Sequence, residues 1–292
     1  MTSADVTRPA TVGRRRTRNS AVPGFGITFG AMTLYLSLVV LIPLAALLLR
    51  AARVGPRELW AAVTSSRALA AFGLSFGGAL GAALIAAIGG SVAAWVLVRY
   101  RFPGRRLLDA LVDLPFALPT AVSGIALATL LAPTGWVGRV IAPLGWKLAY
   151  TRGGVVVAMI LVSLPFIVRT LQPAMADLPL DVEEAAATLG GGRLRTVFTV
   201  VAPQLLPALG SGFALAFARA VGEYGSVIFI AGNLPNKTEI VPLLIIVQLE
   251  QYNYAAATAL GAAMLLASFT ILLVIHLLPR WLARRRNAPV AA

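Results

Sequence analysis

Arg219 and Glu223 are the residues of this sequence whose types and spacing could do chemistry. They stand four residues apart, on one face of a predicted helix, inside a long apolar run. Charged side chains within a membrane are costly, so they face a partner or a watery path far more often than lipid. Arginine also suits an oxyanion, because its N–H donors fork onto two oxygens. The spacing therefore indicates either a polar path or gate, or a structural Arg–Glu pair.

The sequence gives little support for metal binding, nucleotide binding or catalysis. The chain has no cysteine, and its single histidine, His276, is expected to be a packing residue near the end of an apolar run, because a metal site needs several ligands. Lys147 and Lys237 are the two lysines, and neither follows a glycine in a phosphate-binding loop pattern. An intramembrane enzyme would have to rely on Glu223 and Arg219 alone, so we expect no catalytic residue and no bound metal or cofactor.

The composition indicates a membrane protein. Of the 292 residues 59% are hydrophobic and only 12% are charged, whereas a soluble domain carries about a quarter charged residues. The charges gather between apolar runs of membrane-spanning length, which predicts a single polytopic membrane domain. The net charge of +14 comes from arginines that flank these runs, so anionic lipid headgroups are expected partners and nucleic acid is not.

Six apolar runs are long enough to cross a bilayer. Backbone donors and acceptors have no partner in lipid, so the spans should be helices, and the strand-like alternation of a β-barrel is absent. The fold class is therefore all-α, with six transmembrane helices. Their predicted ranges are 27–49, 70–98, 109–132, 154–172, 205–231 and 255–279.

Basic residues set the expected orientation. With the N-terminus inside, the cytoplasmic side carries about twice as many basic residues as the outer side, which favours N-in and C-in. Residues 1–26 are predicted to be a disordered basic cytoplasmic arm, residues 27–283 the membrane domain and residues 284–292 a cytoplasmic tail.

Glycines and prolines within the runs predict close packing and irregular helices. We expect the glycines of the second span to pack inside the chain, and the prolines to kink or break helices. The glycines are Gly73, Gly77, Gly81 and Gly89, and the prolines are Pro43, Pro115, Pro119 and Pro165. Asp109 and Asp113 are expected at the membrane surface, paired with Arg105 or Arg106.

The polar stretch DVEEAAATLGGGRLRTVFTVVAP interrupts the apolar sequence at Asp181–Pro203. Asp181 is a predicted N-cap, and Glu184 stands three residues later, as in a capping box. Gly190–Gly192 should end this helix, and a second helix should run from about Arg193 until Pro203 ends it. One apolar stripe follows that second helix, formed by Leu194, Val197, Phe198 and Val201.

This helix, glycine turn and helix have two physical interpretations. The small alanines and accessible glycines suit a knob that enters a groove on another protein. Two interfacial helices that lie on the bilayer would show the same amphipathic pattern.

The stretch resembles the EAA loop of bacterial ABC-importer permeases. Glu184-Ala185-Ala186, Gly190 and Pro203 match the spacing of that motif, although Val200 and Ala202 replace its usual Ile and Leu. The resemblance covers nearly the whole chain after about residue 25, and implies a type I ABC-importer permease fold. It implies that a coupling loop at about 173–204 docks into a separate ATPase, through Glu183, Glu184, Ala185, Ala186, Gly190 and Pro203.

Within this family, the stretch ARAVGEYGSVIFIAGN at Ala218–Asn233 is most similar to sulfate/thiosulfate permeases of the CysT type. The resemblance implies a multi-pass protein of the bacterial inner membrane. We expect Arg219, Glu223 and Tyr224 at the translocation path or gate, with a structural pair in the bundle or at the subunit interface as the alternative. The resemblance further implies a second permease of the CysW type, two ATPase subunits of the CysA type that carry ATP and Mg²⁺, and an extracytoplasmic sulfate-binding protein. Molybdate, tungstate or another oxyanion is the alternative substrate.

Overall fold

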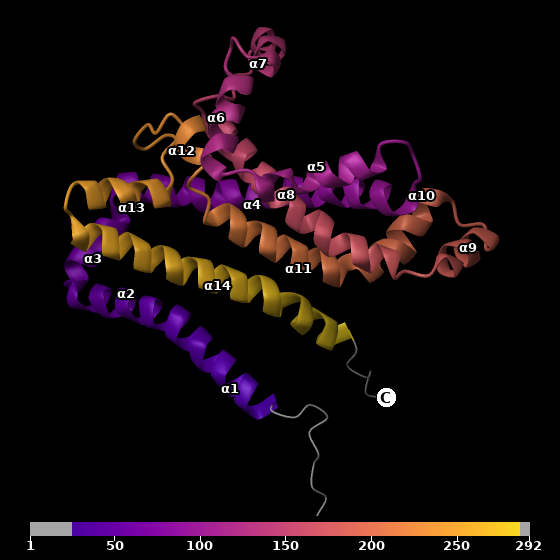
Figure 1. Cartoon of the computed structure of the whole chain (residues 1–292), viewed down its shortest axis with the longest axis horizontal. Helices are drawn as coiled ribbons and strands as arrows, with labels where there is room; N and C mark the ends of the chain where they lie inside the picture. Colours follow the sequence, from indigo (N-terminus) through magenta and orange to yellow (C-terminus); the bar gives the residue numbers. More distant parts are fainter. Residues whose placement is uncertain (1–24, 287–292) are drawn as a thin grey trace, which may run out of the picture. The chain divides into compact units, whose positions relative to one another are not determined.

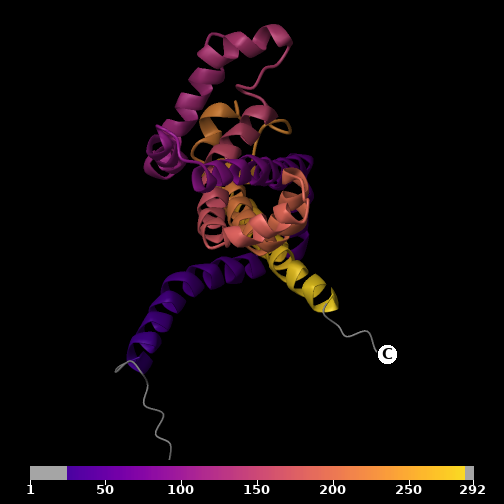
Figure 2. The same ribbon diagram turned by 90° about the vertical axis from the view of Figure 1, so that its right-hand side faces the viewer.

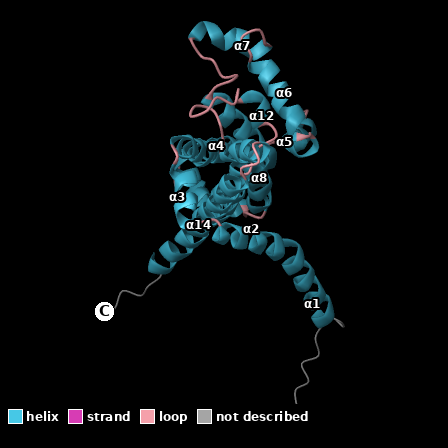
Figure 3. Ribbon diagram, turned by 90° about the vertical axis from the view of Figure 1, so that its left-hand side faces the viewer, coloured by secondary structure: helices cyan, strands magenta, loops and turns pink. Residues whose placement is uncertain are grey.

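A computed structural model describes residues 25–286 of the chain. Nearly all of the predicted arm over 1–26, and most of the predicted tail over 284–292, lie outside these residues. All regular elements in the described range are helices, joined by loops, with no strand among them (Figure 3). This confirms the all-α class.

The chain falls into two compact units, residues 1–46 and 47–292. The described part of the first unit is one apolar helical run. It consists of α1 (Phe25–Leu36), a π-helical turn η1 (Ser37–Leu41) and the start of α2 (Ile42–Arg53).

Four long helices dominate the second unit (Figure 1). They are α4 (Ser66–Arg99), α8 (Arg152–Ala176), α11 (Ala202–Val221) and α14 (Tyr254–Arg286). The shorter elements are α3 (Pro56–Thr64), α5 (Arg105–Ala117), α6 (Thr120–Leu131), α7 (Trp136–Ile141), η2 (Ala142–Leu144), α9 (Leu180–Thr188), α10 (Arg193–Thr196), η3 (Val197–Val201), α12 (Val227–Ile230) and α13 (Val241–Glu250).

Six helical segments of the described chain are long and apolar enough to cross a membrane, which confirms the predicted number. They are Phe25–Arg53, Ser66–Arg99, Thr120–Leu144, Arg152–Ala176, Arg193–Val221 and Tyr254–Ile275. The third and fifth spans differ from their predicted ranges, because a proline divides the third and a glycine ends the fifth.

The third span does not begin at residue 109. Leu118 is extended, with φ −83° and ψ 134°, and separates α5 from α6. The ring of Pro119 disfavours helical backbone at the residue before it, so the apolar run divides there. α5 is a separate helix, and the spanning segment starts at Thr120 and includes α6, α7 and η2.

The fifth span ends at Val221, ten residues before its predicted end. Gly222 caps α11, and a turn leads into the short helix α12. The chain then forms α13, a ten-residue apolar helix that the sequence analysis missed because it is too short to span. The helix break lies beside Gly222 and Gly225.

The core forms where α4, α8 and α11 pack together. Small residues allow this close approach: a Cβ atom placed on Gly90 would lie 2.7 Å from Ile167 Cγ2, and one on Gly78 would lie 3.3 Å from Met159 Sδ. Buried α4 residues such as Ala82 and Ala86 continue the same face. The backbones therefore approach more closely than larger side chains would permit.

Four glycines of the second span are predicted to pack inside the chain, and the prediction is wrong for three of the four. A Cβ atom on Gly73, Gly77 or Gly81 would meet nothing within 4 Å, and one on Gly89 would only touch Leu164 at 4.0 Å. The four-residue spacing identifies a common face but does not say which face is buried. Gly78 and Gly90 lie on the packed face.

The prolines act in different ways. Pro119 breaks the helix, as predicted, whereas Pro165 lies inside an uninterrupted α8. Pro43 follows the π-helical turn η1, and Pro203 follows the π-helical turn η3. Proline lacks an N–H donor and its ring crowds the preceding turn, so a wider turn accommodates it without ending the helix.

Asp109 and Asp113 do not pair with Arg105 or Arg106 as predicted. Their carboxylates accept hydrogen bonds from Arg169 of α8, at 2.7 Å from Nη1 to Asp109 and 2.7 Å from Nε to Asp113. The Gln172 amide also donates to Asp109 at 3.0 Å, and its hydrogen bond lowers the pKa of that carboxyl. Arg169 reaches both carboxylates from the neighbouring helix, and so fixes α5 against α8.

The packing at Gly90 predicts that the same glycine-to-alanine change has opposite effects on stability at two positions of α4. Gly90→Ala places a methyl group against Ile167, and we expect it to destabilise the protein by about 1–3 kcal/mol. Gly73→Ala enters open space, where alanine favours the helix by about 0.5–1 kcal/mol. Thermal unfolding of the purified protein in detergent, followed by tryptophan fluorescence, should show a lower Tm for the first variant only. Equal Tm values would contradict the packing of α4 on α8.

Candidate coupling segment and polar helix break

The segment after α8 is a helix, a glycine turn and a second helix, as the sequence predicts. α9 and α10 lie at the end of the bundle where α4 and α8 also end (Figure 1), and Figure 2 faces this end. α9 begins at Leu180, so Asp181 stands in the first turn and not at the predicted N-cap. Asp181 and Glu183 are favoured in that turn by the positive end of the helix dipole.

Gly190 makes the turn between the two helices possible. Its φ is +79°, in the left-handed region that residues with a Cβ atom rarely adopt. The Gly191 N–H donates to the Ala186 carbonyl at 2.9 Å, which satisfies one of the last carbonyls of α9. We call residues 180–203 the coupling segment.

The coupling segment presents apolar side chains at its surface. Leu189, Leu194 and Phe198 are 88%, 76% and 71% exposed. The predicted stripe is therefore divided, because Val201 is buried while Leu194 and Phe198 are not. Glu184 and Ala185 are exposed as well, and the Glu184 carboxylate has no partner among the described residues.

Glu183 lies differently from Glu184. Its carboxylate accepts a hydrogen bond from Arg99 Nη2 at 2.5 Å, and the pair joins α9 to the last residue of α4. The two adjacent glutamates of the sequence thus have separate environments, one within the chain and one at its surface.

Pro203 does not end the second helix. α10, the π-helical turn η3 and α11 form one helical run from Arg193 to Val221. The Ala202 N–H donates to the Val197 carbonyl, five residues back, which widens the helix immediately before the proline. The coupling segment is therefore continuous with the fifth span.

A polar break lies at the other end of that run. Glu223 follows the helix end and is 1% exposed. Its carboxylate binds Arg219 Nη1 at 2.6 Å, the Ser226 N–H at 2.9 Å and the Ser226 hydroxyl at 2.8 Å. We call residues 219–226 the polar break, because the Glu223 carboxylate there binds donors on both sides of the helix end, Arg219 before it and Ser226 after it.

The polar break packs tightly on α6. A Cβ atom on Gly225 would lie 2.0 Å from Thr120 Oγ1, and one on Gly124 would lie 2.4 Å from the Ser226 carbonyl oxygen. Arg219 is one-third exposed, and its remaining N–H groups have no partner among the described residues. Tyr224, the third predicted path residue, follows Glu223 in the chain and is half-buried. The structure therefore pairs two of the predicted residues, Arg219 and Glu223.

A second ion pair holds the segment after the break. Arg67 Nε and Nη2 each lie 2.7 Å from an oxygen of Glu239, which is 3% exposed. Arg152 Nε donates to the Lys237 carbonyl at 2.7 Å. These two arginines anchor the loop that precedes α13 to the starts of α4 and α8.

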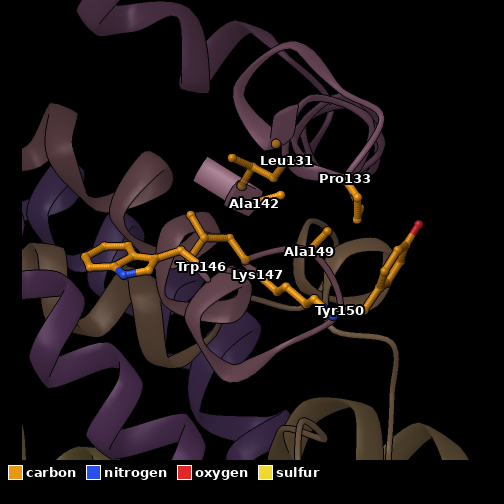
Figure 4. Close-up of a pocket in the computed structure, with 9 residues that line it drawn as sticks. Leu131, Pro133, Ala142, Trp146, Lys147, Ala149 and Tyr150 are labelled. Atoms are coloured by element: carbon orange, nitrogen blue, oxygen red, sulfur yellow. The ribbon is translucent and has the colours of Figure 1, made fainter. Parts of the chain in front are cut away.

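A hollow of 190 Å³ lies between the end of α6 and the loop that follows η2 (Figure 4). Its lining is mostly apolar, with polar groups on Trp146 and Tyr150, and Lys147 is the one charged side chain that borders it. It includes none of the predicted path residues.

Sequence reasoning missed the partners of Glu183, Glu239 and Arg169. Each pair joins residues that are far apart along the chain, so no local spacing indicates it. One signal was available: the predicted spans place both residues of each pair at the same side of the membrane.

Comparisons with known proteins add to this geometry. The family described as binding-protein-dependent transport system inner membrane component matches residues 86–288. The chain is 49% identical over 254 residues to the sulfate transport system permease protein CysT of Synechocystis sp., which covers 87% of this chain and 89% of that protein. It is 44% identical over 264 residues to the CysT protein of Salmonella typhimurium, which covers 90% and 95%.

Solved structures agree on the fold. The chain superposes with a TM-score of 0.73 on a chain of the crystal structure of a bacterial alginate ABC transporter in complex with a periplasmic protein that holds an alginate pentasaccharide. The two share 15% identity, and the match covers 88% of this chain and 94% of that chain. The six spans, the coupling segment and these matches lead to one conclusion: the chain belongs to the family of binding-protein-dependent transport system inner-membrane components.

Proposed function

We propose that this chain is the membrane-spanning permease subunit of an ATP-driven importer of sulfate and thiosulfate. The observation that carries the proposal is the identity of 44–49% with sulfate permeases over nearly the whole chain. Their names favour sulfate over molybdate or tungstate. The chain contributes a path and a coupling surface, and carries out no covalent chemistry.

The remaining parts of the importer are separate proteins. The sequence has no phosphate-binding loop, so ATP and Mg²⁺ are held by two ATPase subunits of the CysA type. A second permease of the CysW type completes the path, and an extracytoplasmic sulfate-binding protein delivers the anion. The N-terminus and C-terminus of this chain lie in the cytoplasm, within the predicted arm 1–26 and tail 284–292.

The coupling segment meets the ATPase through its exposed face. Glu184, Ala185 and Gly190 are at the surface, and Leu189, Leu194 and Phe198 supply apolar area around them. An amphipathic helix of this kind inserts its apolar side chains into a groove of the partner. Glu183 and Ala186 are half-buried next to this surface, and Pro203 is exposed.

The polar break acts as the gate of the path. Arg219 keeps unpaired N–H donors while Glu223 offsets its charge, so an oxyanion is attracted without being held tightly. Arg219, Glu223 and Tyr224 lie where the fifth span ends and the chain turns. A change in the direction of α11 therefore alters the opening beside them.

The transport cycle is a shift between two populations. ATP binding closes the ATPase pair, the coupling segment moves with it, and the helices change from inward-open to outward-open. Hydrolysis restores the first state. Reversing such an equilibrium from 1:99 to 99:1 requires a difference of about 5.5 kcal/mol in binding between the two states.

Transport of radioactive sulfate tests the substrate. We expect ATP-dependent uptake of sulfate-35 into proteoliposomes that contain this chain, the second permease, the ATPase and the binding protein. Excess unlabelled thiosulfate should compete, whereas excess molybdate should compete weakly. Strong competition by molybdate would contradict the proposed substrate and leave the permease assignment intact.

Two glycines of the coupling segment provide a matched test of its turn. Gly190→Val forces a β-branched residue into the left-handed region, which costs about 1–2 kcal/mol or more. Gly192→Val is the control, because Gly192 has φ −64° and ψ 152°, which valine adopts without strain. At both positions the added Cβ atom would meet no atom within 4 Å. We expect Gly190→Val to reduce ATPase retention and uptake about tenfold. Similar uptake by both variants would contradict a coupling role for this turn.

The gate is tested by Glu223→Gln, which keeps the shape of the side chain and removes its charge. Arg219 then stays within the span without a counter-charge, so we expect uptake to fall by about tenfold or more. ATP hydrolysis by the complex should persist, because the ATPase contacts are unchanged. Glu250→Gln is the control, since Glu250 is exposed and has no partner among the described residues. Parallel loss of uptake, hydrolysis and complex yield would indicate a structural role only.

A further inference from the structure

The Arg99–Glu183 ion pair is a contact between the coupling segment and α4. Arg99 is the last residue of α4 and Glu183 stands in the first turn of α9, 84 residues later in the chain. Nη2 of the arginine lies 2.5 Å from Oε1 of the glutamate. The side chains are 14% and 25% exposed, so most of the pair is removed from water.

Arg99 depends on Glu183 for its charge balance. Its guanidinium lies over the Trp95 ring, 5.6 Å from the ring centre, and its Nε is buried without a hydrogen-bond partner. Glu183 is the one carboxylate that binds this guanidinium among the described residues. Removing one partner of a mostly buried pair leaves an uncompensated charge, so its loss costs more free energy than the loss of an exposed ion pair.

The neighbouring glutamate faces elsewhere. Successive residues of a helix point about 100° apart, and Glu184 is exposed while Glu183 is held against α4. One acidic residue is thus free for a partner protein and the other is occupied within the chain.

The helix that Arg99 ends is the longest in the described chain, at 34 residues, and it packs along both α8 and α11. α9 packs against α10 and η3, which continue directly into α11. A displacement of α9 is therefore transmitted to α11 through the continuous chain of α10 and η3. The ion pair transmits the same displacement to α4.

We propose that the Arg99–Glu183 pair fixes α9 to α4 throughout the transport cycle, so that the ATPase moves α4 and α11 together. Glu183 is then a positioning residue that acts through Arg99, whereas Glu184 contacts the ATPase. This inference rests on the proposed role of the coupling segment.

Single and exchanged substitutions test the pair in the complete importer. We expect Glu183→Gln and Arg99→Gln each to lower uptake per ATP hydrolysed by about tenfold, while the amount of ATPase retained by the complex stays unchanged. The exchange of both residues, Arg99→Glu with Glu183→Arg, should restore much of the lost coupling. Glu184→Gln should instead reduce ATPase retention. Glu58→Gln, at an exposed glutamate without a described partner, is the neutral control.

Loss of ATPase retention in Glu183→Gln, equal to that in Glu184→Gln, would overturn the inference, because Glu183 would then be a docking residue. Failure of the exchanged pair to restore coupling, with the complex intact, would also overturn it. If the wild-type importer moves no sulfate, the proposed substrate fails. The pair is then judged by ATPase retention and by the stimulation of ATP hydrolysis.

Crosslinking gives a second test, in which a covalent link replaces the ion pair. The chain has no cysteine, so Arg99→Cys with Glu183→Cys introduces one pair of thiols that a bismaleimide can join. If α9 and α4 move as one body, the crosslink takes the place of the ion pair, and the crosslinked importer should regain much of the uptake that the uncrosslinked double variant loses. Arrest of uptake upon crosslinking would show that α9 moves relative to α4 and would overturn the proposal.

Discussion

A positive charge among apolar helices needs a carboxylate, and this constraint determines how the helices of the second unit are joined. Arg67, Arg99, Arg169 and Arg219 each bind at least one Asp or Glu. The pairs of Arg99 and Arg169 connect different helices, and the pair of Arg67 connects α4 to the loop before α13. The alanines and glycines of the core permit close approach of the helices. Because similar small residues recur along each helix, they only weakly fix how far one helix is shifted along its neighbour. The ion pairs are few and directional, so they fix which ends of the helices meet.

The sequence was sufficient to predict the helical class, the number of spans and the helix, glycine turn and helix of the coupling segment. These depend on hydropathy and on local residue preferences, which neighbouring residues reveal. It was not sufficient to identify the partner of Glu183 or of Asp113, because each partner lies more than fifty residues away in the chain. A four-residue glycine spacing likewise could not distinguish the packed face of α4 from the open one.

Proline was the least predictable residue, because its effect depends on the helix around it. Pro119 ends a helix, Pro165 leaves α8 continuous, and Pro203 is accommodated by a π-helical turn. The same π-helical solution precedes Pro43 in the first unit. A wider turn keeps backbone groups bonded to one another, which matters in lipid because no water is present to replace a lost partner.

The continuity of α10, η3 and α11 has a mechanical consequence. Its 29 residues form a rod about 43 Å long at about 1.5 Å per residue, which exceeds the hydrocarbon thickness of a bilayer. Such a rod acts as a lever arm: a tilt of about 5° displaces its far end by roughly 4 Å, more than the diameter of a water molecule. A displacement of the Arg193 end of the run is therefore transmitted to Arg219 with an amplitude that depends on the length of the helix, because no loop interrupts the run.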